Sequence, residues 1–119
     1  MAASSTVSIT GTVTDLPTGD KAIGPITCTS AAAVASETQL VLASGANTIT
    51  VPAAATLAII VFDATSNVNK TLKGVTGDTG ILVAKAGCFM LQLDAAAVAS
   101  FVITAASADT AKTTTVIFI

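Results

Sequence analysis

An alternation of apolar and polar residues with a period of two is the feature that most limits how this chain can fold. In segment 6–14, Val7, Ile9 and Val13 alternate with serine and threonine, and Gly11 takes the place of one apolar residue. Successive side chains of a β-strand point to opposite faces, so this pattern predicts a strand with one buried face. The glycine predicts a β-bulge within that strand.

Clusters of turn-forming residues divide the rest of the chain into short segments of the same kind. Segment 16–25 contains two prolines, two glycines and an aspartate, so we expect a loop there. Segments 44–47 (SGAN) and 63–67 (DATSN) are expected to be turns. The strand candidates between these signals are 26–29, 37–43, 48–51, 56–62, 69–75, 80–85, 88–93, 101–105 and 113–119. Strands spaced by about 8–12 residues predict an all-β domain, an antiparallel β-sandwich of jelly-roll-like type.

Segment 56–62 differs from the other strand candidates because it is nearly all apolar. A strand without alternation is typical of a central position that is covered on both faces. We therefore expect this strand near the middle of the sandwich, with protein on each side of it.

The alanine-rich hexamer AAAVAS occurs twice, at 31–36 and 95–100, and is the main ambiguity in the strand pattern. Alanine favours helix, and Asp94 could cap the second copy, so each copy is expected to form one helical turn across an end of the sandwich. The residues that flank the two copies differ, which indicates compositional bias and not a duplication. The prediction is one domain, 1–119, with residues 1–5 as a flexible N-terminal arm.

The composition indicates that much of the surface is covered by protein. Hydrophobic residues make up 52% of the chain and charged residues 10%, whereas a soluble domain usually carries about 25% charged residues. We expect a homo-oligomer, with a trimer as the first expectation, or incorporation into a larger shell. The longest apolar run, 51–62, is interrupted by Pro52 and is shorter than the roughly 20 residues of a spanning helix, so no membrane segment is expected. The N-terminus has neither the basic nor the apolar region of a signal peptide.

The absent residue types restrict the possible ligands. The chain has no His, no Arg, no Trp and no Tyr, and its five lysines are scattered, so nucleic-acid binding is not expected. Cys28 and Cys88, without histidine or a CxxC pair, do not form an ordinary zinc site. We expect two buried free thiols, with a disulfide between them left as the alternative. No cofactor is expected.

Catalysis is not expected either, although one triplet matches a catalytic signature. Asp78-Thr79-Gly80 has the Asp-Thr-Gly sequence of the aspartic proteases, but it follows Gly77 late in the chain and no flap-like segment comes after it. A turn between two strands, with glycine where φ is positive, explains it better. A calcium site there would have a single carboxylate. No serine is placed beside a lysine in a nucleophile elbow. We therefore expect no catalytic, cofactor-binding or metal-binding residues.

Three segments resemble small virion proteins of tailed bacteriophages: 59–67 (IIVFDATSN), 72–81 (LKGVTGDTGI) and 113–119 (TTTVIFI). The order of an apolar strand, a polar turn, a glycine-containing hairpin and a final strand is similar to the β-sandwich proteins that decorate capsids or form fibre and tail subunits. The resemblance covers about the C-terminal half. It implies an oligomeric structural protein of the virion, assembled in the host cytoplasm, which binds its own copies and other virion proteins such as the major capsid protein.

The resemblance makes a capsid decoration (cement) protein, which stabilises the head shell, the leading expectation. The alternatives are a tail or head-fibre subunit, or a host-receptor or carbohydrate-binding module. The candidate interaction residues are Val116, Ile117, Phe118 and Ile119, because a free apolar strand promotes aggregation unless it is paired in a sheet or docked on a partner.

Overall fold

The computed structural model describes residues 4–31, 36–94 and 100–119, and its regular structure consists of β-strands. They are β1 (Ser4–Val13), β2 (Lys21–Ala31), β3 (Ser36–Leu40), β4 (Gly45–Thr50), β5 (Leu57–Phe62), β6 (Lys70–Lys73), β7 (Ile81–Val83), β8 (Gly87–Gln92), β9 (Ser100–Ala105) and β10 (Thr114–Phe118). The all-β prediction is confirmed. The helical turns expected from the AAAVAS repeats fall on residues 32–35 and 95–99, which lie outside the described residues.

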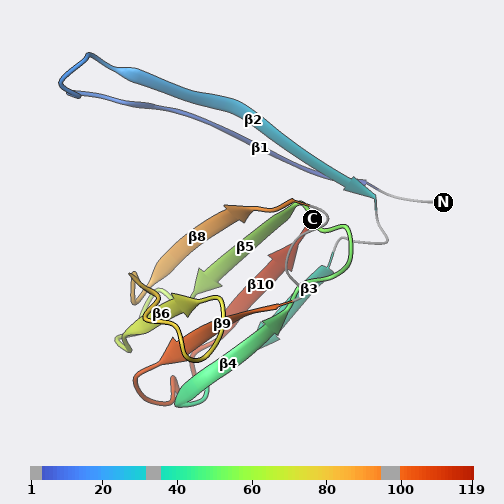
Figure 1. The fold of residues 1–119 in the computed structure, drawn as a ribbon, viewed down its shortest axis with the longest axis vertical. Helices are drawn as coiled ribbons and strands as arrows, with labels where there is room; N and C mark the ends of the chain where they lie inside the picture. The colour runs from blue at the N-terminus through green and yellow to red at the C-terminus, as the bar shows by residue number, and fades with distance from the viewer. Residues whose placement is uncertain (1–3, 32–35, 95–99) are drawn as a thin grey trace.

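Eight of these strands form two four-stranded antiparallel sheets, which pack face to face as a β-sandwich (Figure 1). One sheet has the order β3-β10-β5-β8, and the other has the order β4-β9-β6-β7. Strands β1 and β2 form a separate two-stranded hairpin that projects from the sandwich (Figure 1). Ser4 and Ser5, which were expected in a flexible arm, belong to β1.

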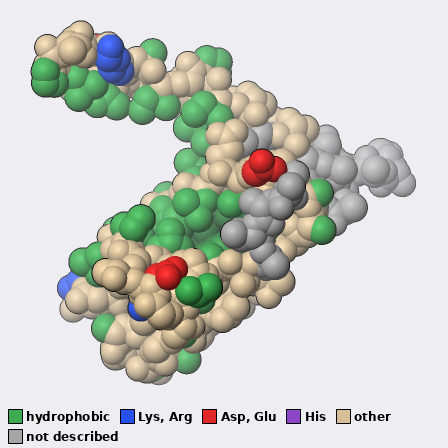
Figure 2. All heavy atoms as spheres, viewed as in Figure 1, with side chains coloured by type: hydrophobic (Ala, Val, Ile, Leu, Met, Phe, Trp, Pro, Cys, Tyr) green, Lys and Arg blue, Asp and Glu red, His purple; other side chains and the backbone are tan. Residues whose placement is uncertain are grey.

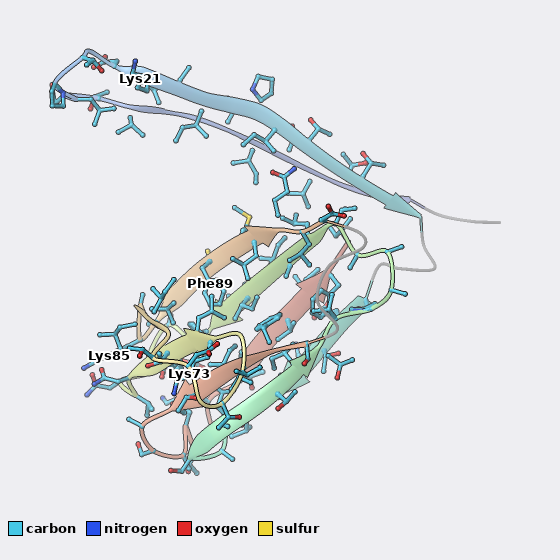
Figure 3. All side chains as sticks on the ribbon, viewed as in Figure 1. Lys21, Lys73, Lys85 and Phe89 are labelled. Carbon is cyan, nitrogen blue, oxygen red and sulfur yellow. The ribbon has the colours of Figure 1, made fainter. Side chains whose placement is uncertain are left out.

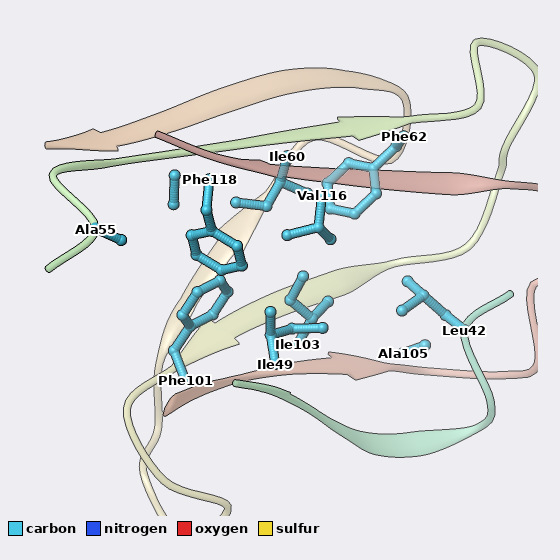
Figure 4. Packing of buried hydrophobic residues seen from close by; sticks show 11 residues of the cluster. Leu42, Ile49, Ala55, Ile60, Phe62, Phe101, Ile103, Ala105, Val116 and Phe118 are labelled. Carbon is cyan, nitrogen blue, oxygen red and sulfur yellow. The ribbon is translucent and has the colours of Figure 1, made fainter. Parts of the chain in front are cut away.

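The core lies between the two sheets and consists of the side chains that point inward from every second position. Strand β5 contributes Ile60 and Phe62, and β10 contributes Val116 and Phe118; all four are at most 5% exposed (Figure 4). The Phe118 ring meets the Phe101 ring of the opposite sheet edge-on, with 6.5 Å between the ring centroids. The period-two pattern therefore places aromatic and branched side chains from both sheets in one layer.

The hairpin begins its second strand earlier than the sequence pattern predicts. The prediction of a loop over 16–25 is wrong for its second half, because β2 starts at Lys21. A proline in a central strand would remove a hydrogen bond of the ladder, but both strands of an isolated hairpin are edge strands, so Pro25 is tolerated within β2.

The bulge expected near Gly11 is present, and β2 supplies the extra residue. The register shifts between Ile9 and Gly11, so that Gly24 and Pro25 lie opposite the single residue between them. Gly24 has φ +79°, and a Cβ atom there would lie 2.2 Å from the Ile9 carbonyl oxygen. The bulge thus requires glycine on the strand that the sequence pattern assigned to a loop.

Lys70 is completely buried at the end of the sandwich that contains the β5–β6, β7–β8 and β9–β10 connections. Its Nζ donates to Ser66 Oγ at 2.7 Å and to the carbonyl oxygens of Lys85 at 2.7 Å and Val68 at 3.1 Å. It lies 3.4 Å from the Asp109 carboxylate, and it sits over the Phe62 ring, 4.7 Å from its centroid. All three ammonium protons are satisfied inside the protein, as a buried charge requires.

Lys70 and Asp109 together connect four segments that link one sheet to the other. Ser66 and Val68 belong to the β5–β6 connection, Lys85 to the β7–β8 connection, and Asp109 to the β9–β10 connection. The Asp109 backbone N–H donates to the Leu42 carbonyl oxygen in the β3–β4 connection at 2.9 Å. One ammonium group and one carboxylate therefore hold together all the sheet crossings at this end.

Replacing Asp109 with Asn should destabilise the protein by about 3–5 kcal/mol, because the buried Lys70 ammonium then has no carboxylate. The double variant Lys70→Met, Asp109→Asn should lose less than the two single variants together, since no unpaired charge remains. Urea unfolding measures both differences. The exposed Lys85→Met variant is the matched control and should change stability by less than about 0.5 kcal/mol. A loss of the same small size in Asp109→Asn would contradict the role of the pair.

Candidate functional site

The sheet β3-β10-β5-β8 has a second apolar face, on the side opposite the core. In β5, Leu57, Ile59 and Val61 alternate with the core residues, and the strand register aligns them with residues of β8 and β10. We call this surface the outer face, and its residues are Leu57, Ile59, Val61, Cys88, Met90, Ile117 and Ile119. Val61 is 39% exposed and Met90 is 42% exposed. An exposed apolar surface of this kind is a candidate contact site.

The β1–β2 hairpin has one apolar and one polar face. Val7 and Ile9 are half-buried, whereas the threonine and serine residues that alternate with them are exposed. We call the apolar side the arm face, and its residues are Val7, Ile9, Val13, Ile23 and Ile26. On the polar side, hydroxyl groups pair across the strands, Thr6 with Thr29 and Ser8 with Thr27, each at 3.3 Å. The hairpin therefore presents apolar side chains on one side and hydroxyl groups on the other.

The two apolar faces touch at one end of the hairpin. Val7 packs against the small cluster of Leu57 and Ile119, which Ile59 and Ile117 extend. Beyond this contact the hairpin runs over the β5–β8 side of the sandwich and moves away from it toward its tip (Figure 1). Close backbone contacts of β1 and β2 in the described structure are almost all between these two strands. On the outer face, Val61, Cys88 and Met90 are exposed, whereas the residues near Val7 are buried or half-buried.

The candidate interaction residues 116–119 are divided between the two faces of one strand. Strand β10 is paired on both sides, with β3 and with β5, so the sandwich itself supplies its neighbours. Val116 and Phe118 point into the core, and Ile117 and Ile119 belong to the outer face. The Ile119 carbonyl oxygen accepts hydrogen bonds from the backbone N–H groups of Thr56 and Leu57. Deleting this strand would remove core as well as surface, so assembly has to be tested by surface substitutions.

Cys88 lies on the outer face, and the expectation that it is buried is wrong. Its thiol is free and exposed, because β8 is the edge strand of its sheet and the outer face is uncovered there. Cys28 lies in β2 opposite Val7, and its side chain is outside the described part of the structure.

A second apolar feature is the hollow at the open edge of the sandwich, between β6–β7 and β8 (Figure 2). It has a volume of about 530 Å³, and its lining includes Leu72, Ile81, Leu91 and Phe101, with Lys73 and Asp78 at the β6–β7 turn. Phe101 is 5% exposed, so its ring offers little stacking surface to a ligand. The hollow is a shallow apolar depression with charged side chains at its border.

Asp78 stabilises a turn, as the glycines around it indicate. Its Oδ2 accepts hydrogen bonds from the backbone N–H groups of Gly74 at 3.1 Å and Val75 at 3.0 Å. Gly80 has φ +77°, and a Cβ atom there would lie 2.6 Å from the Leu72 carbonyl oxygen. Among the described residues, no group of three or more His, Cys, Asp or Glu side chains could hold a metal ion.

The structure brings a serine and a lysine together, which the sequence analysis did not anticipate. Ser66 Oγ lies 2.7 Å from Lys70 Nζ and donates to the Asp109 carboxylate at 2.9 Å. In a catalytic dyad the lysine accepts the serine proton. Here the lysine donates to the serine, the serine proton is directed at Asp109, and all three side chains are buried. This arrangement is typical of a structural network, and no sequence signal places Ser66 and Lys70 next to Asp109.

Comparisons with protein-family models, with curated proteins and with solved structures found no match to this chain. Over the described residues, no helix is long and apolar enough to cross a membrane.

Replacing Asp78 with Ala should lower the free energy of unfolding by about 1 kcal/mol, because two backbone donors of the turn lose their acceptor. Asp78→Asn keeps an oxygen at the same place and should lose less. Thermal unfolding followed by circular dichroism measures both. A peptide-cleaving activity that disappears in Asp78→Asn would contradict the structural role and point to the protease chemistry of the triplet.

Proposed function

We propose that this protein is a structural subunit of a bacteriophage particle, a capsid decoration protein that binds and stabilises the head shell. The observation that carries the proposal is the pair of uncovered apolar surfaces, one on a sandwich and one on a projecting hairpin. A surface of this kind is typical of proteins whose function is assembly with other subunits.

The chemistry of the remaining surface supports an assembly role. The chain carries 10% charged residues, and the described hairpin presents mainly Thr, Ser and small apolar side chains. Such side chains lose little conformational entropy when they pack against another protein. Ser66, Lys70 and Asp109 form a buried network whose hydrogen bonds are satisfied within the sandwich. These side chains therefore stabilise the fold.

A tail or head-fibre subunit has the same physical requirements and is the first alternative. A host-receptor or carbohydrate-binding module is a second candidate, and the hollow beside β8 is the observation that favours it. Sugar-binding sites usually expose aromatic rings. The aromatic residue that lines this hollow is buried, which favours the assembly role over sugar binding.

The proposal is tested on particles from the source of the protein. Gold-labelled antibodies against the exposed 74–80 turn should bind the head surface in electron micrographs, in a regular array. Shells without the protein should lose integrity at lower temperature and regain it when purified protein is added. Labelling confined to the tail would replace the decoration role with the fibre or tail role. Absence of the protein from purified particles would overturn the structural proposal.

A further inference from the structure

The arm face of the β1–β2 hairpin and the outer face of the sandwich are both made mainly of aliphatic side chains. They already meet at the base of the hairpin, where Val7 packs on Leu57 and Ile119. Further along the hairpin, the arm face is open: Ile23 is 42% exposed and Val13 is 39% exposed. The contact at the base shows which side of the hairpin packs on which side of the sheet.

We infer that the hairpin is an exchange arm, whose arm face docks on the outer face of a second copy of this chain. Each copy gives one arm and receives one, in a closed dimer or ring. The inference rests on the assembly role proposed above and names the first partner in that assembly. In this arrangement Val7 packs on the outer face of its own chain, and the rest of the arm face packs on the outer face of the neighbouring chain.

The path of the hairpin favours a second copy over its own sandwich. The ribbon moves away from its own sheet toward the tip, where Lys21 lies far from the sandwich (Figure 3). Strands of 10 and 11 residues give an arm about 33 Å long, whereas the six residues of β5 span about 20 Å. The arm is longer than β5, on which its base packs, and its tip is directed away from its own sandwich. The tip therefore extends toward a neighbouring copy.

The area of the exchange fits a weak interface that dissociates on dilution. Because the receiving strand β5 spans about 20 Å, an arm about 10 Å wide covers about 200 Å² on each of the two surfaces, so that one docked arm buries about 400 Å². Reciprocal exchange between two copies doubles this to about 800 Å², which is the size of a weak, reversible contact.

The charges on the two surfaces are compatible with this docking. Within β5, β8 and β10 the described outer face contains no charged residue, and Glu37 of β3 lies beside Ile117 at its far edge, where the side chain is exposed. Lys21 is the charged residue aligned with the arm face. Lys21 pairs with Val13 at the end of the arm, next to the turn, where its ammonium stays in water. Exchange therefore covers apolar side chains without burying an unpaired charge, which would cost several kcal/mol.

An isolated hairpin also needs a third layer or strand for stability. Two strands alone are marginally stable in water, and the described contacts of this hairpin with its own sandwich are limited to the Val7 end. Docking on a neighbour supplies the missing support for the arm and the missing cover for β5, which is apolar on both faces.

The experiment uses the purified full chain and two readouts, mass by light scattering and the labelling rate of the Cys88 thiol assigned by peptide mapping. We expect a mass of two or more chains at high concentration and one chain on dilution. At about ten times the concentration of the midpoint, mass action for a dimer leaves about one chain in five as monomer, so Cys88 should label about fivefold more slowly than in the dilute protein.

Three variants locate the interface. Ile23→Lys on the arm face and Met90→Lys on the outer face should both give one chain at all concentrations, with rapid Cys88 labelling in the Ile23 variant. Thr12→Lys introduces the same charge on the polar side of the same hairpin and should behave like the unmodified protein. Circular dichroism should show the same strand content in all three, because each side chain is exposed in the single chain.

Two results would overturn the inference. A single chain at every concentration with Cys88 protected would show that the arm closes on its own sheet. A single chain with Cys88 rapidly labelled would show that both faces are left for a different protein. Neither result concerns whether the protein is present on particles, so failure of the exchange and failure of the virion role are distinguished.

Discussion

The burial of the Lys70 ammonium is the constraint on which the sandwich depends most. A sandwich of two sheets is closed by the segments that cross between them, and four such segments meet at this one group and its Asp109 partner. The buried charge is stabilised there because each ammonium proton of Lys70 has an acceptor and the Phe62 ring lies against the ammonium group. The hydrophobic layer between the sheets supplies most of the free energy of folding, while this pair fixes which connections come together.

The strand pattern was predictable from the sequence because alternation is a local property. Nearly all the strand candidates coincide with strands of the structure, and the turn at 63–67 forms with the Thr65 backbone N–H and hydroxyl donating to Asp63. The same hydrogen bonds keep the pKa of the Asp63 carboxyl below its usual value. Prediction failed where the outcome depends on distant residues. Pro25 can lie in a strand only because β2 has no second neighbour, and Lys70 meets Asp109 only through the order of the strands.

The candidate surface was visible in the sequence only in part. The nearly all-apolar segment 56–62 predicts a strand that is covered on both sides, and the structure provides the core on one side and Val7 at one end of the other. The exposed position of Cys88 could not be foreseen, because a cysteine in an apolar segment is usually buried, and β8 becomes exposed only as the edge of its sheet. The role of residues 116–119 in interaction stays a prediction, and the chain itself supplies paired strands on both sides of β10.

The single contact at the base of the hairpin also has a mechanical consequence. A hairpin that is held at one end works as a lever, and the small cluster around Val7 is its pivot. With an arm of about 33 Å, a rotation of about 10° at the pivot moves the tip by about 6 Å. Small adjustments of packing among a few aliphatic side chains would therefore let identical chains reach neighbours set at different angles, as on a surface whose curvature changes from place to place.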